Sequence, residues 1–380
     1  MGWMADENGL EKRKANYVPL TPLTNLRRAA RIWPGREALV YGSFRKTYAE
    51  YIDRVTRLAS ALTTLGIKPG DVVATILPNL PPHAEAHFGV PACGAVLNAI
   101  NTRLEPDTIA YILDHGGAKV VLCDSQFIPV LAEALERMEG PAPTIIECPD
   151  DQAGVHVQSD HQTYEDLLAS GDPGFDWILP EDEWESIALN YTSGTTGRPK
   201  GVVYHHRGAH QNAMGQILSW RMQLYPRYLT IVPLFHCNGW CHTWMIPLLG
   251  GTVVCCRDIT APALFSAFAD EGVTHFGGAP IVLNMLVNAP EDQRRPFPQT
   301  VEVFTAGAPP APATLAAIEP MGFNVTQVYG LTEVYGPATE CTWDDDLWGD
   351  LQGDARAAIK ARQGVAMPAY DDITVMTSEM

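Results

Sequence analysis

The chain has 380 residues and a formal net charge of −18, so its surface repels polyanions and we exclude nucleic acid as a partner. Any anionic ligand must therefore be held by local donors. With 46% hydrophobic and 18% charged residues, the composition is typical of a globular protein rather than a disordered one. At this length, two or three packed subdomains are expected.

No membrane segment or disulfide framework is indicated. The N-terminus lacks the apolar core of a signal peptide, and the most apolar stretch, residues 244–256, is interrupted by Pro247, Gly250 and Gly251. The eight cysteines lie mostly in apolar runs, which suits reduced thiols in a core. We expect a cytoplasmic protein with no membrane partner.

Strand and helix signals alternate along the first half of the chain. Thr47 and Glu50 form a capping box before a helical run that ends near Gly66. A buried strand over 71–77 follows, and the later signals are helices at 82–88 and 106–114 and a strand at 119–123. These are βαβ units, which favour parallel sheets.

A looser stretch over 141–182, rich in Asp, Gly and Pro, is a candidate joint between subdomains. Beyond it we predict helices over 262–269 and 312–318, and strands over 187–191, 228–232, 252–256, 273–276, 301–305 and 324–329. The alternation predicts an α/β fold with mainly parallel sheets covered by helices.

Residues 191–202, YTSGTTGRPKGV, have the composition of a flexible linker but follow a predicted buried strand, where ligands collect in α/β sheets. Gly194 and Gly197 let backbone amides converge on an anion, and Lys200 supplies a mobile charge. Hydroxyl donors come from Thr192, Ser193, Thr195 and Thr196. The spacing is too short for a Walker A loop, and Gly201 replaces the magnesium-binding Ser/Thr.

The run YTSGTTGRPKG resembles the phosphate loop of the adenylate-forming superfamily, which includes acyl-CoA synthetases, firefly-luciferase-like enzymes and peptide-synthetase adenylation domains. The resemblance covers nearly the whole chain. It implies an α/β N-terminal domain over 1–380, with two mainly parallel sheets, packed helices and a β-barrel-like C-terminal part. Within it we expect subdomains over about 20–182 and 183–345 and the start of a third at 346–380.

The family's second nucleotide motif is matched by Tyr329, Gly330, Leu331, Thr332 and Glu333. By resemblance, Thr332 bonds the α-phosphate of ATP, and Glu333 holds Mg²⁺ together with Thr192; a carboxylate is a suitable hard ligand for this ion. A simple Thr-Glu helix start is the local alternative.

The turn TAGAPP, residues 305–310, resembles the adenine-binding turn, and a plain βα turn is its alternative. Its predicted nucleotide contacts are Gly307, Ala308 and Pro309. Gln327 and Val328 lead from the next strand into the second motif and belong to the same predicted site.

The segment 233–240, PLFHCNGW, resembles the wall of the family's acid pocket. We therefore expect His236, Trp240 and Gly307 to line that pocket, and Lys200, Thr332 and His236 to take part in catalysis. Ordinary core packing is the alternative for an unplaced His and Trp. A zinc site at His236, Cys237, Cys241 and His242 is disfavoured, because no second ligand pair at finger-like spacing follows.

The resemblance implies an ATP-dependent acid–thiol ligase that adenylates a small carboxylic acid and passes the acyl group to CoA, with Mg²⁺ bound. The strings HFGGAPIVLNML, YGLTEVYGPAT and RQGV resemble the short- and medium-chain branch, and within it the 3-methylmercaptopropionate CoA ligases of bacterial dimethylsulfoniopropionate breakdown. Homodimers are common in that branch, so the resemblance makes a homodimer possible, but the sequence itself does not determine the oligomeric state.

In the family a smaller C-terminal lid domain supplies a ribose-binding Asp and a catalytic Lys, and this sequence stops at Met380 before either motif. We therefore expect residues 1–380 to bind nucleotide but to adenylate weakly or not at all. Two alternatives stay open: an amino-acid or aryl-acid adenylation enzyme, and a catalytically silent nucleotide-binding protein.

Overall fold

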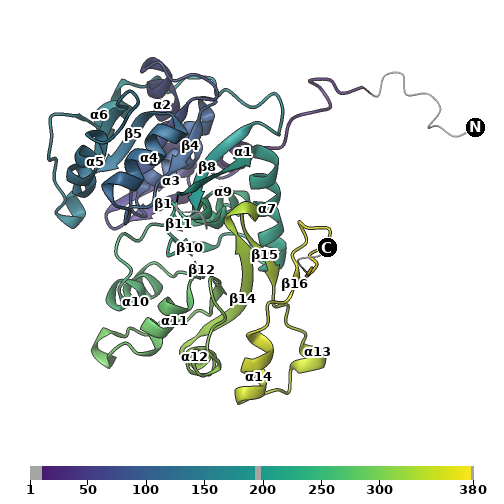
Figure 1. The fold of residues 1–380 in the computed structure, drawn as a ribbon. Helices are drawn as coiled ribbons and strands as arrows, with labels where there is room; N and C mark the ends of the chain where they lie inside the picture. The colour runs from purple at the N-terminus through teal and green to yellow at the C-terminus, as the bar shows by residue number, and fades with distance from the viewer. Residues whose placement is uncertain (1–10, 193–197, 378–380) are drawn as a thin grey trace, which may run out of the picture.

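The computed structural model describes residues 11–192 and 198–377, which form two sheets (Figure 1). One sheet has seven strands and lies in the blue to teal part of the ribbon. The other has nine strands and lies mainly in the green and yellow part. No helix among the described residues is long and apolar enough to cross a bilayer. The predicted α/β fold with two mainly parallel sheets is confirmed.

The seven-stranded sheet has the order β7-β6-β5-β3-β4-β8-β9. All its neighbours pair in parallel except β8 and β9, which form an antiparallel hairpin. Its strands are β3 (Val72–Ile76), β4 (Val96–Ala99), β5 (Ala118–Asp124), β6 (Thr144–Cys148), β7 (Gln162–Thr163), β8 (Ser186–Thr192) and β9 (Lys200–His205).

The nine-stranded sheet has the order β16-β15-β14-β13-β12-β10-β11-β1-β2 and is parallel at its centre. Its strands are β1 (Glu37–Tyr41), β2 (Phe44–Thr47), β10 (Arg227–Leu229), β11 (Thr252–Val254), β12 (His275–Gly278), β13 (Val301–Thr305), β14 (Phe323–Leu331), β15 (Gly336–Glu340) and β16 (Val365–Ala366). β15 and β16 pair antiparallel at one edge. In the described residues, the predicted β-barrel-like part is this antiparallel edge and not a separate layer.

Helices cover both sheets and lie between them (Figure 1). They are α1 (Leu23–Ile32), α2 (Tyr48–Thr64), α3 (Pro81–Ala92), α4 (Pro106–Gly116), α5 (Ile128–Leu135), α6 (Tyr164–Ser170), α7 (His206–Ser219), α8 (Cys237–Trp240), α9 (His242–Met245), α10 (Ala261–Asp270), α11 (Pro280–Val287), α12 (Pro312–Ile318), α13 (Asp345–Trp348) and α14 (Gly353–Lys360). α2 begins with the predicted capping box, in which the Thr47 hydroxyl and the Glu50 carboxylate each accept a backbone N–H.

The order of the chain does not decide which sheet a strand joins. β1 and β2 precede every strand of the seven-stranded sheet in the chain, yet β1 pairs with β11 in the nine-stranded sheet. β8 and β9 follow the expected joint near residue 183, yet they complete the seven-stranded sheet beside β4. Each lobe therefore takes strands from both sides of that joint.

Buried polar contacts join the two sheets next to the predicted site. Asn79, which follows β3, donates from Nδ2 to the Thr230 carbonyl oxygen at 2.7 Å and accepts from the Leu234 amide at 2.8 Å. The guanidinium of Arg257, which follows β11, binds the buried Asp124 carboxylate at 2.7 Å. The Asn79 bonds hold the segment after β10, which leads to the predicted acid-pocket residues.

Candidate active site

Three of the predicted motifs lie along one edge of the nine-stranded sheet. β10, β12, β13 and β14 run parallel, so their carboxyl ends share an edge, where ligands of open α/β sheets bind. The acid-pocket segment follows β10, the turn TAGAPP follows β13, and Thr332 follows β14. The sheet therefore brings together motifs that are far apart in the sequence.

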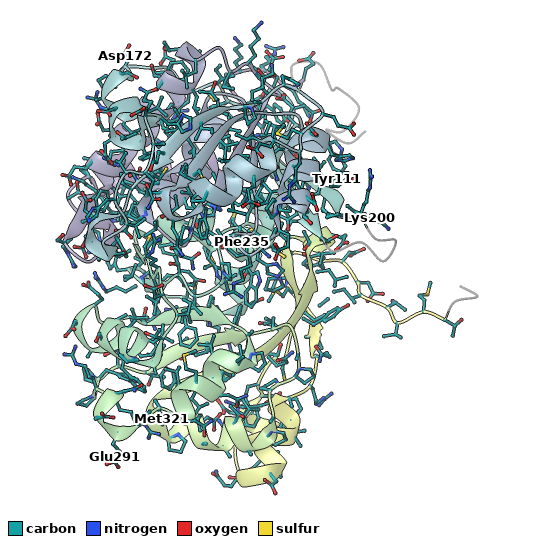
Figure 2. All side chains as sticks on the ribbon, turned by 60° about the vertical axis from the view of Figure 1, so that its left-hand side comes forward. Tyr111, Asp172, Lys200, Phe235, Glu291 and Met321 are labelled. Carbon is teal, nitrogen blue, oxygen red and sulfur yellow. The ribbon has the colours of Figure 1, made fainter. Side chains whose placement is uncertain are left out.

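The β8–β9 hairpin carries the ends of the phosphate loop. Thr192 ends β8 and Lys200 begins β9, and the two residues are register partners. Partners in an antiparallel pair point to the same face, and side chains alternate along each strand. One face of the hairpin thus carries Asn190, Thr192, Lys200 and Tyr204. Lys200 lies at the level where the two lobes meet (Figure 2). The predicted loop residues Ser193, Gly194, Thr195, Thr196 and Gly197 lie outside the described residues.

Two hydrogen bonds connect this hairpin face to the other motifs. The Tyr204 hydroxyl donates to the Thr332 carbonyl oxygen at 2.7 Å, and Asn190 Nδ2 donates to Asn238 Oδ1 at 2.6 Å. All four residues are buried. The strands that flank the predicted phosphate loop are therefore bonded directly to the predicted second nucleotide motif and to the predicted acid-pocket segment.

Thr332 begins a short 3₁₀ turn, Thr332–Val334, and is buried, whereas its neighbour Glu333 is exposed. The Thr332 hydroxyl lies 3.3 Å from the Cys237 sulfur. Burial raises the pKa of the Cys237 thiol, so it is protonated at neutral pH and is not a nucleophile here.

The donors predicted for Mg²⁺ fit this ion chemically. The Thr192 hydroxyl and the Glu333 carboxylate are hard oxygen ligands. Among residues 11–192 and 198–377, no group of three His, Cys, Asp or Glu side chains is arranged to hold a metal. A magnesium ion at Thr192 and Glu333 would therefore take its remaining ligands from phosphates and water, as is usual for Mg²⁺.

The acid-pocket segment is strained. Cys237, Asn238, Gly239, Trp240 and Cys241 all have positive φ, between 41° and 66°. Left-handed backbone costs an L-residue about 1–2 kcal/mol, and such residues usually occur singly. Besides Asn190, the buried Gln216 supports the segment by donating from Nε2 to the Trp240 carbonyl oxygen at 2.7 Å. Strain that is over-determined by neighbours in this way is typical of functional sites.

Trp240 is buried in the described part of the chain and packs closely against two glycines. A Cβ on Gly277 would lie 3.0 Å from the indole Cζ3, and a Cβ on Gly336 would lie 3.2 Å from the Trp240 Cβ. His236 is exposed, yet desolvation lowers its pKa. An exposed imidazole next to the buried Trp240 segment is compatible with the predicted pocket wall.

The geometry around His242 does not favour a zinc site. Its Nδ1 lies 2.5 Å from the Tyr228 hydroxyl and its Nε2 lies 2.8 Å from Gln216 Oε1, so both ring nitrogens are hydrogen-bonded. Burial lowers the pKa of His242 to about 3 and keeps the imidazole neutral. His242 forms part of the packing behind Trp240, with the ring centroids 5.8 Å apart.

The predicted adenine turn is open. Gly307 has φ +93° and nothing within 4 Å of a Cβ placed on it, and Ala308 and Pro309 are exposed. On the strands below, Thr305 and Gln327 are register partners and are buried. Within the described structure, Thr305 Oγ1 and Gln327 Oε1 have no hydrogen-bond partner. Buried polar atoms are usually paired, so these two mark a place suited to a polar ligand.

The end of β14 passes very close to β15. Val328 is buried and Tyr329 is 46% exposed. A Cβ on Gly330 would lie only 1.6 Å from the Gly336 carbonyl oxygen, so glycine is required at this crossing. The crossing sets the direction in which the chain enters the Thr332 turn.

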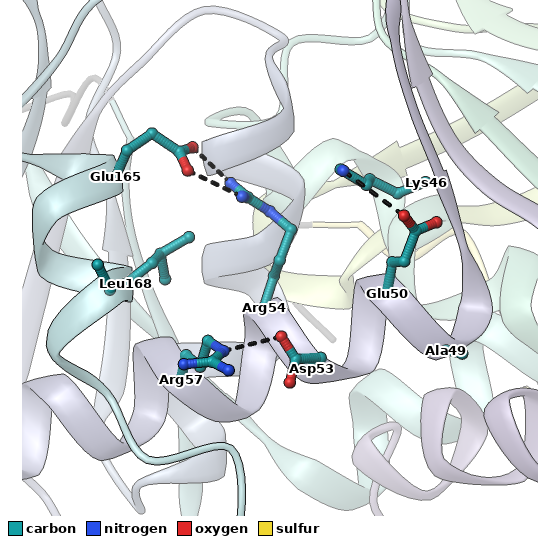
Figure 3. Close-up of a pocket in the computed structure, with 9 residues that line it drawn as sticks. Lys46, Ala49, Glu50, Asp53, Arg54, Arg57, Glu165 and Leu168 are labelled. Atoms are coloured by element: carbon teal, nitrogen blue, oxygen red, sulfur yellow. Dashed lines mark hydrogen bonds and ion pairs between the residues drawn. The ribbon is translucent and has the colours of Figure 1, made fainter.

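A cavity of about 470 Å³ lies elsewhere, between α2 and α6 (Figure 3). Its charged side chains are paired with one another: Arg54 with Glu165, Arg57 with Asp53 and Lys46 with Glu50. None of its lining residues belongs to the motifs described above. The paired charges offer no free cationic group for phosphates, so we do not assign the nucleotide to this cavity.

The sequence predictions assign no role in this site to four of its residues, which are Asn190, Tyr204, Asn238 and Cys237. Cys237 enters them only as a disfavoured zinc ligand. The sequence carries a signal for the two hairpin residues, because side chains alternate along a strand that ends at Thr192 and a strand that begins at Lys200, which places Asn190 and Tyr204 on the same face. The sequence carries no such signal for Asn238 and Cys237, because their positions depend on a left-handed backbone that no local pattern predicts.

Comparison with known proteins agrees with the motifs. Residues 26–379 match the profile of the family described as AMP-binding enzyme. A peroxisomal acetate/butyrate–CoA ligase of Arabidopsis thaliana is 45% identical, with 98% of this chain and 68% of the relative aligned. A peroxisomal trans-cinnamate:CoA ligase of Petunia hybrida is 41% identical over 97% of this chain and 67% of the relative. The chain thus spans about two thirds of the length of these relatives.

Among solved structures, the inhibitor-bound N-terminal domain of FACL13 from Mycobacterium tuberculosis superimposes with a TM-score of 0.79 at 28% identity. The match covers 92% of this chain and 83% of that domain. The two sheets described above are therefore those of a large N-terminal domain already seen in a crystal.

Proposed function

Since the chain belongs to the AMP-binding enzyme family of AMP-forming acyl-CoA ligases, we propose that it activates a short-chain carboxylic acid with ATP and Mg²⁺ and forms the CoA thioester. The observation that carries this proposal is the hairpin face on which Thr192 and Lys200 project, bonded through Tyr204 to the Thr332 turn. It joins the ends of the phosphate loop to the second nucleotide motif.

In the first step a carboxylate oxygen attacks the α-phosphorus of ATP, and pyrophosphate leaves with the electrons of the broken P–O bond. Lys200 offsets the negative charge on the phosphates, and the Thr332 hydroxyl holds the α-phosphate, so that electrostatic positioning lowers the barrier. Bound Mg²⁺, held by Thr192 and Glu333, would offset further phosphate charge. In the second step the CoA thiolate attacks the acyl carbon, and AMP leaves.

A short acid is supported by the packing at the predicted pocket wall. Trp240 lies against Gly277, with the hydrogen-bonded His242 packed near it, so bulky side chains occupy that side of the predicted pocket. The relative aligned at 45% identity is named for acetate and butyrate. We place butyrate and 2-methylpropanoate first. 3-Methylmercaptopropionate, in which sulfur replaces one methylene of pentanoate, is a further candidate for the same pocket.

The test separates binding of the activated acid from turnover. Acyl-sulfamoyl-adenosines mimic the acyl-adenylate without reacting, and their affinities for residues 1–380 are measurable by calorimetry beside AMP alone. We expect the butyryl compound to bind at least tenfold more tightly than AMP, because binding energy from the acyl group adds to that of the nucleotide. The 3-(methylthio)propanoyl, 2-methylpropanoyl, cinnamoyl and aminoacyl compounds rank the alternatives.

Acid-dependent pyrophosphate exchange and acyl-CoA formation are measured in parallel. Lys200→Ala removes the phosphate cation and should weaken ATP binding by residues 1–380 together with any exchange they support, whereas Lys119→Ala, a lysine of β5 that pairs with Asp71, should leave ATP binding unchanged. If every acyl compound binds no better than AMP, the ligase proposal is wrong and the silent nucleotide-binding alternative stands. Preference for an aminoacyl or cinnamoyl compound would instead favour the amino-acid or aryl-acid alternative.

A further inference from the structure

We propose that Tyr204 is a positioning residue that fixes the Thr332–Glu333 turn relative to Lys200. Strand β9 carries both Lys200 and Tyr204, and their even spacing places both side chains on the same face. One end of the strand thus presents a phosphate cation, and the other end holds the motif predicted to bind the α-phosphate and magnesium. This inference rests on the proposed nucleotide roles of Lys200, Thr332 and Glu333.

Tyr204 acts on the turn through its hydroxyl and its ring. The hydroxyl donates to the Thr332 carbonyl oxygen at 2.7 Å, and the Tyr335 amide donates to the same oxygen at 3.1 Å. The turn alone would supply only the second bond. The Tyr204 ring also lies against the Tyr335 ring, with centroids 4.1 Å apart, and Tyr335 ends the turn in a left-handed conformation with φ 66°.

The residues that follow Tyr204 brace the same turn from the other side. The His205 amide donates to the Tyr335 hydroxyl at 3.1 Å. Gly208, in the first turn of α7, leaves the room that the Tyr335 ring occupies, since a Cβ there would lie 2.3 Å from its Cζ atom. Three positions of one short segment, 204 to 208, therefore locate the turn, and that segment continues directly from Lys200.

Tyr204 has no contact with solvent, and burial raises the pKa of its hydroxyl, so the group remains a hydrogen-bond donor at any physiological pH. Its fully buried position means that it acts on a ligand only through Thr332. Loss of the hydroxyl should leave the ring stack in place but free the turn to shift, which would misplace Thr332 and Glu333 relative to Lys200.

The test is ATP binding to residues 1–380, measured by calorimetry with and without Mg²⁺. Tyr204→Phe removes only the hydroxyl. The matched control is Tyr51→Phe in α2, because Tyr51 is equally buried and its hydroxyl also donates to a backbone carbonyl, that of Ala84 at 3.0 Å. We expect Tyr204→Phe to weaken MgATP binding about fivefold, the effect of one net hydrogen bond. The loss should be smaller without Mg²⁺, and Tyr51→Phe should bind like the unsubstituted protein.

A second variant tests the link without removing the hydroxyl. Gly208→Ala raises intrinsic helix propensity in α7 but pushes on the Tyr335 ring. We expect weaker MgATP binding without a matching fall in melting temperature, which a purely structural role would not produce. This variant also decides the question if Tyr204→Phe fails to fold.

The outcomes distinguish the two proposals. If the unsubstituted protein does not bind ATP, the proposed function is wrong and this inference falls with it. If the protein binds ATP but Tyr204→Phe and Gly208→Ala bind equally well, the ligase proposal survives and the positioning role is wrong. Equal losses for Tyr204→Phe and Tyr51→Phe would likewise overturn the role, because they would reflect general destabilisation.

Discussion

The two halves of the candidate site are built differently. In the hairpin half, which comprises β8, β9, the acid-pocket segment and the Thr332 turn, buried polar side chains bond across elements, as Asn190 does to Asn238 and Tyr204 to Thr332. In the edge half, which comprises Thr305, the turn 306–310 and Gln327, the turn is exposed, and two buried oxygens have no partner among the described residues.

The difference indicates which half of the site maintains its geometry and which half is suited to bind a ligand. A buried polar group left unpaired costs about 1–3 kcal/mol, so proteins keep one mainly where a ligand completes it. Within the described structure, both halves retain unpaired buried atoms, which are Asn190 Oδ1 and Asn238 Nδ2 in the hairpin half and Thr305 Oγ1 and Gln327 Oε1 in the edge half. In the hairpin half, however, short side-chain hydrogen bonds also join one element to another, so this half holds more of its geometry by itself. Substitutions in the hairpin half should therefore reduce stability, and those in the edge half should mainly reduce affinity.

Acid should produce the largest effect, which acts on the stability of the whole protein through buried histidines, two of which lie next to the hairpin half. Burial lowers the pKa of His83 and His242 to about 3 and the pKa of His87, His206 and His275 to about 4. His206 follows β9, and His242 packs behind Trp240. In the unfolded chain these groups titrate near 6.5. Between about pH 6.5 and pH 4 the unfolded state binds more protons, so the free energy of unfolding falls as pH falls.

Within that pH window, each of these histidines contributes up to about 1.4 kcal/mol per pH unit to the dependence of the unfolding free energy on pH. Above about pH 6.5 the histidines contribute no such dependence. Urea unfolding at a series of pH values measures the slope. His242→Gln should reduce it, whereas His156→Gln, at an exposed site, should not. A stability that stays constant from pH 6.5 to 5 would show that the buried histidines are already protonated in the fold.

The same substitution at two glycines, one in β14 just before the Thr332 turn and one in the edge half, gives the next largest contrast. Gly330→Ala places a Cβ 1.6 Å from the Gly336 carbonyl oxygen, so β14 and β15 must separate, at a cost of about 3 kcal/mol or more. The Cβ added by Gly307→Ala would have no atom of the described structure within 4 Å, so this substitution costs only the backbone strain at φ +93°, about 1–2 kcal/mol. Urea unfolding of both variants gives the comparison, and equal losses would contradict the view that the edge half is the looser one.

Asn190→Ala should cost about 1–3 kcal/mol, because it removes the partner of the buried Asn238 and with it a support of the left-handed segment. We also expect weaker binding of butyryl-sulfamoyl-adenosine. Asn98→Ala is the control, since Asn98 is buried and donates to the Leu189 carbonyl oxygen at 2.9 Å within the seven-stranded sheet. It should lower the melting temperature without changing affinity. A parallel loss of affinity in both variants would remove any special role for Asn190.

Thr305→Val should have the smallest effect and the opposite sign on stability. The hydroxyl has no partner among the described residues, so an isosteric apolar group should stabilise the fold by up to about 1 kcal/mol while weakening nucleotide binding. Thr339→Val, by contrast, removes a hydroxyl that donates to the Gln363 carbonyl oxygen at 2.6 Å and should destabilise the protein. Destabilisation by Thr305→Val would mean that this hydroxyl is bonded in solution.

Local patterns predicted the elements better than their assembly. The capping box at Thr47 and Glu50 and the strand over 187–191 are confirmed, because caps and periodicity depend on neighbours in sequence. The hairpin of β1 and β2 went unpredicted, and its place beside β11 depends on a pairing between residues more than two hundred positions apart. No local signal encodes such a partner.

The sequence by itself determined the chemistry of the site: hydroxyls, glycines and Lys200 in one loop, Thr332 and Glu333 in another motif, and the order that identifies the family. Only the tertiary structure decided that Tyr204 holds Thr332, that Asn190 reaches Asn238, and that residues 237–241 take a left-handed path. These facts depend on strand register and on contacts between residues distant in sequence, because a side chain's partner is set by how the two sheets pack and not by its neighbours along the chain.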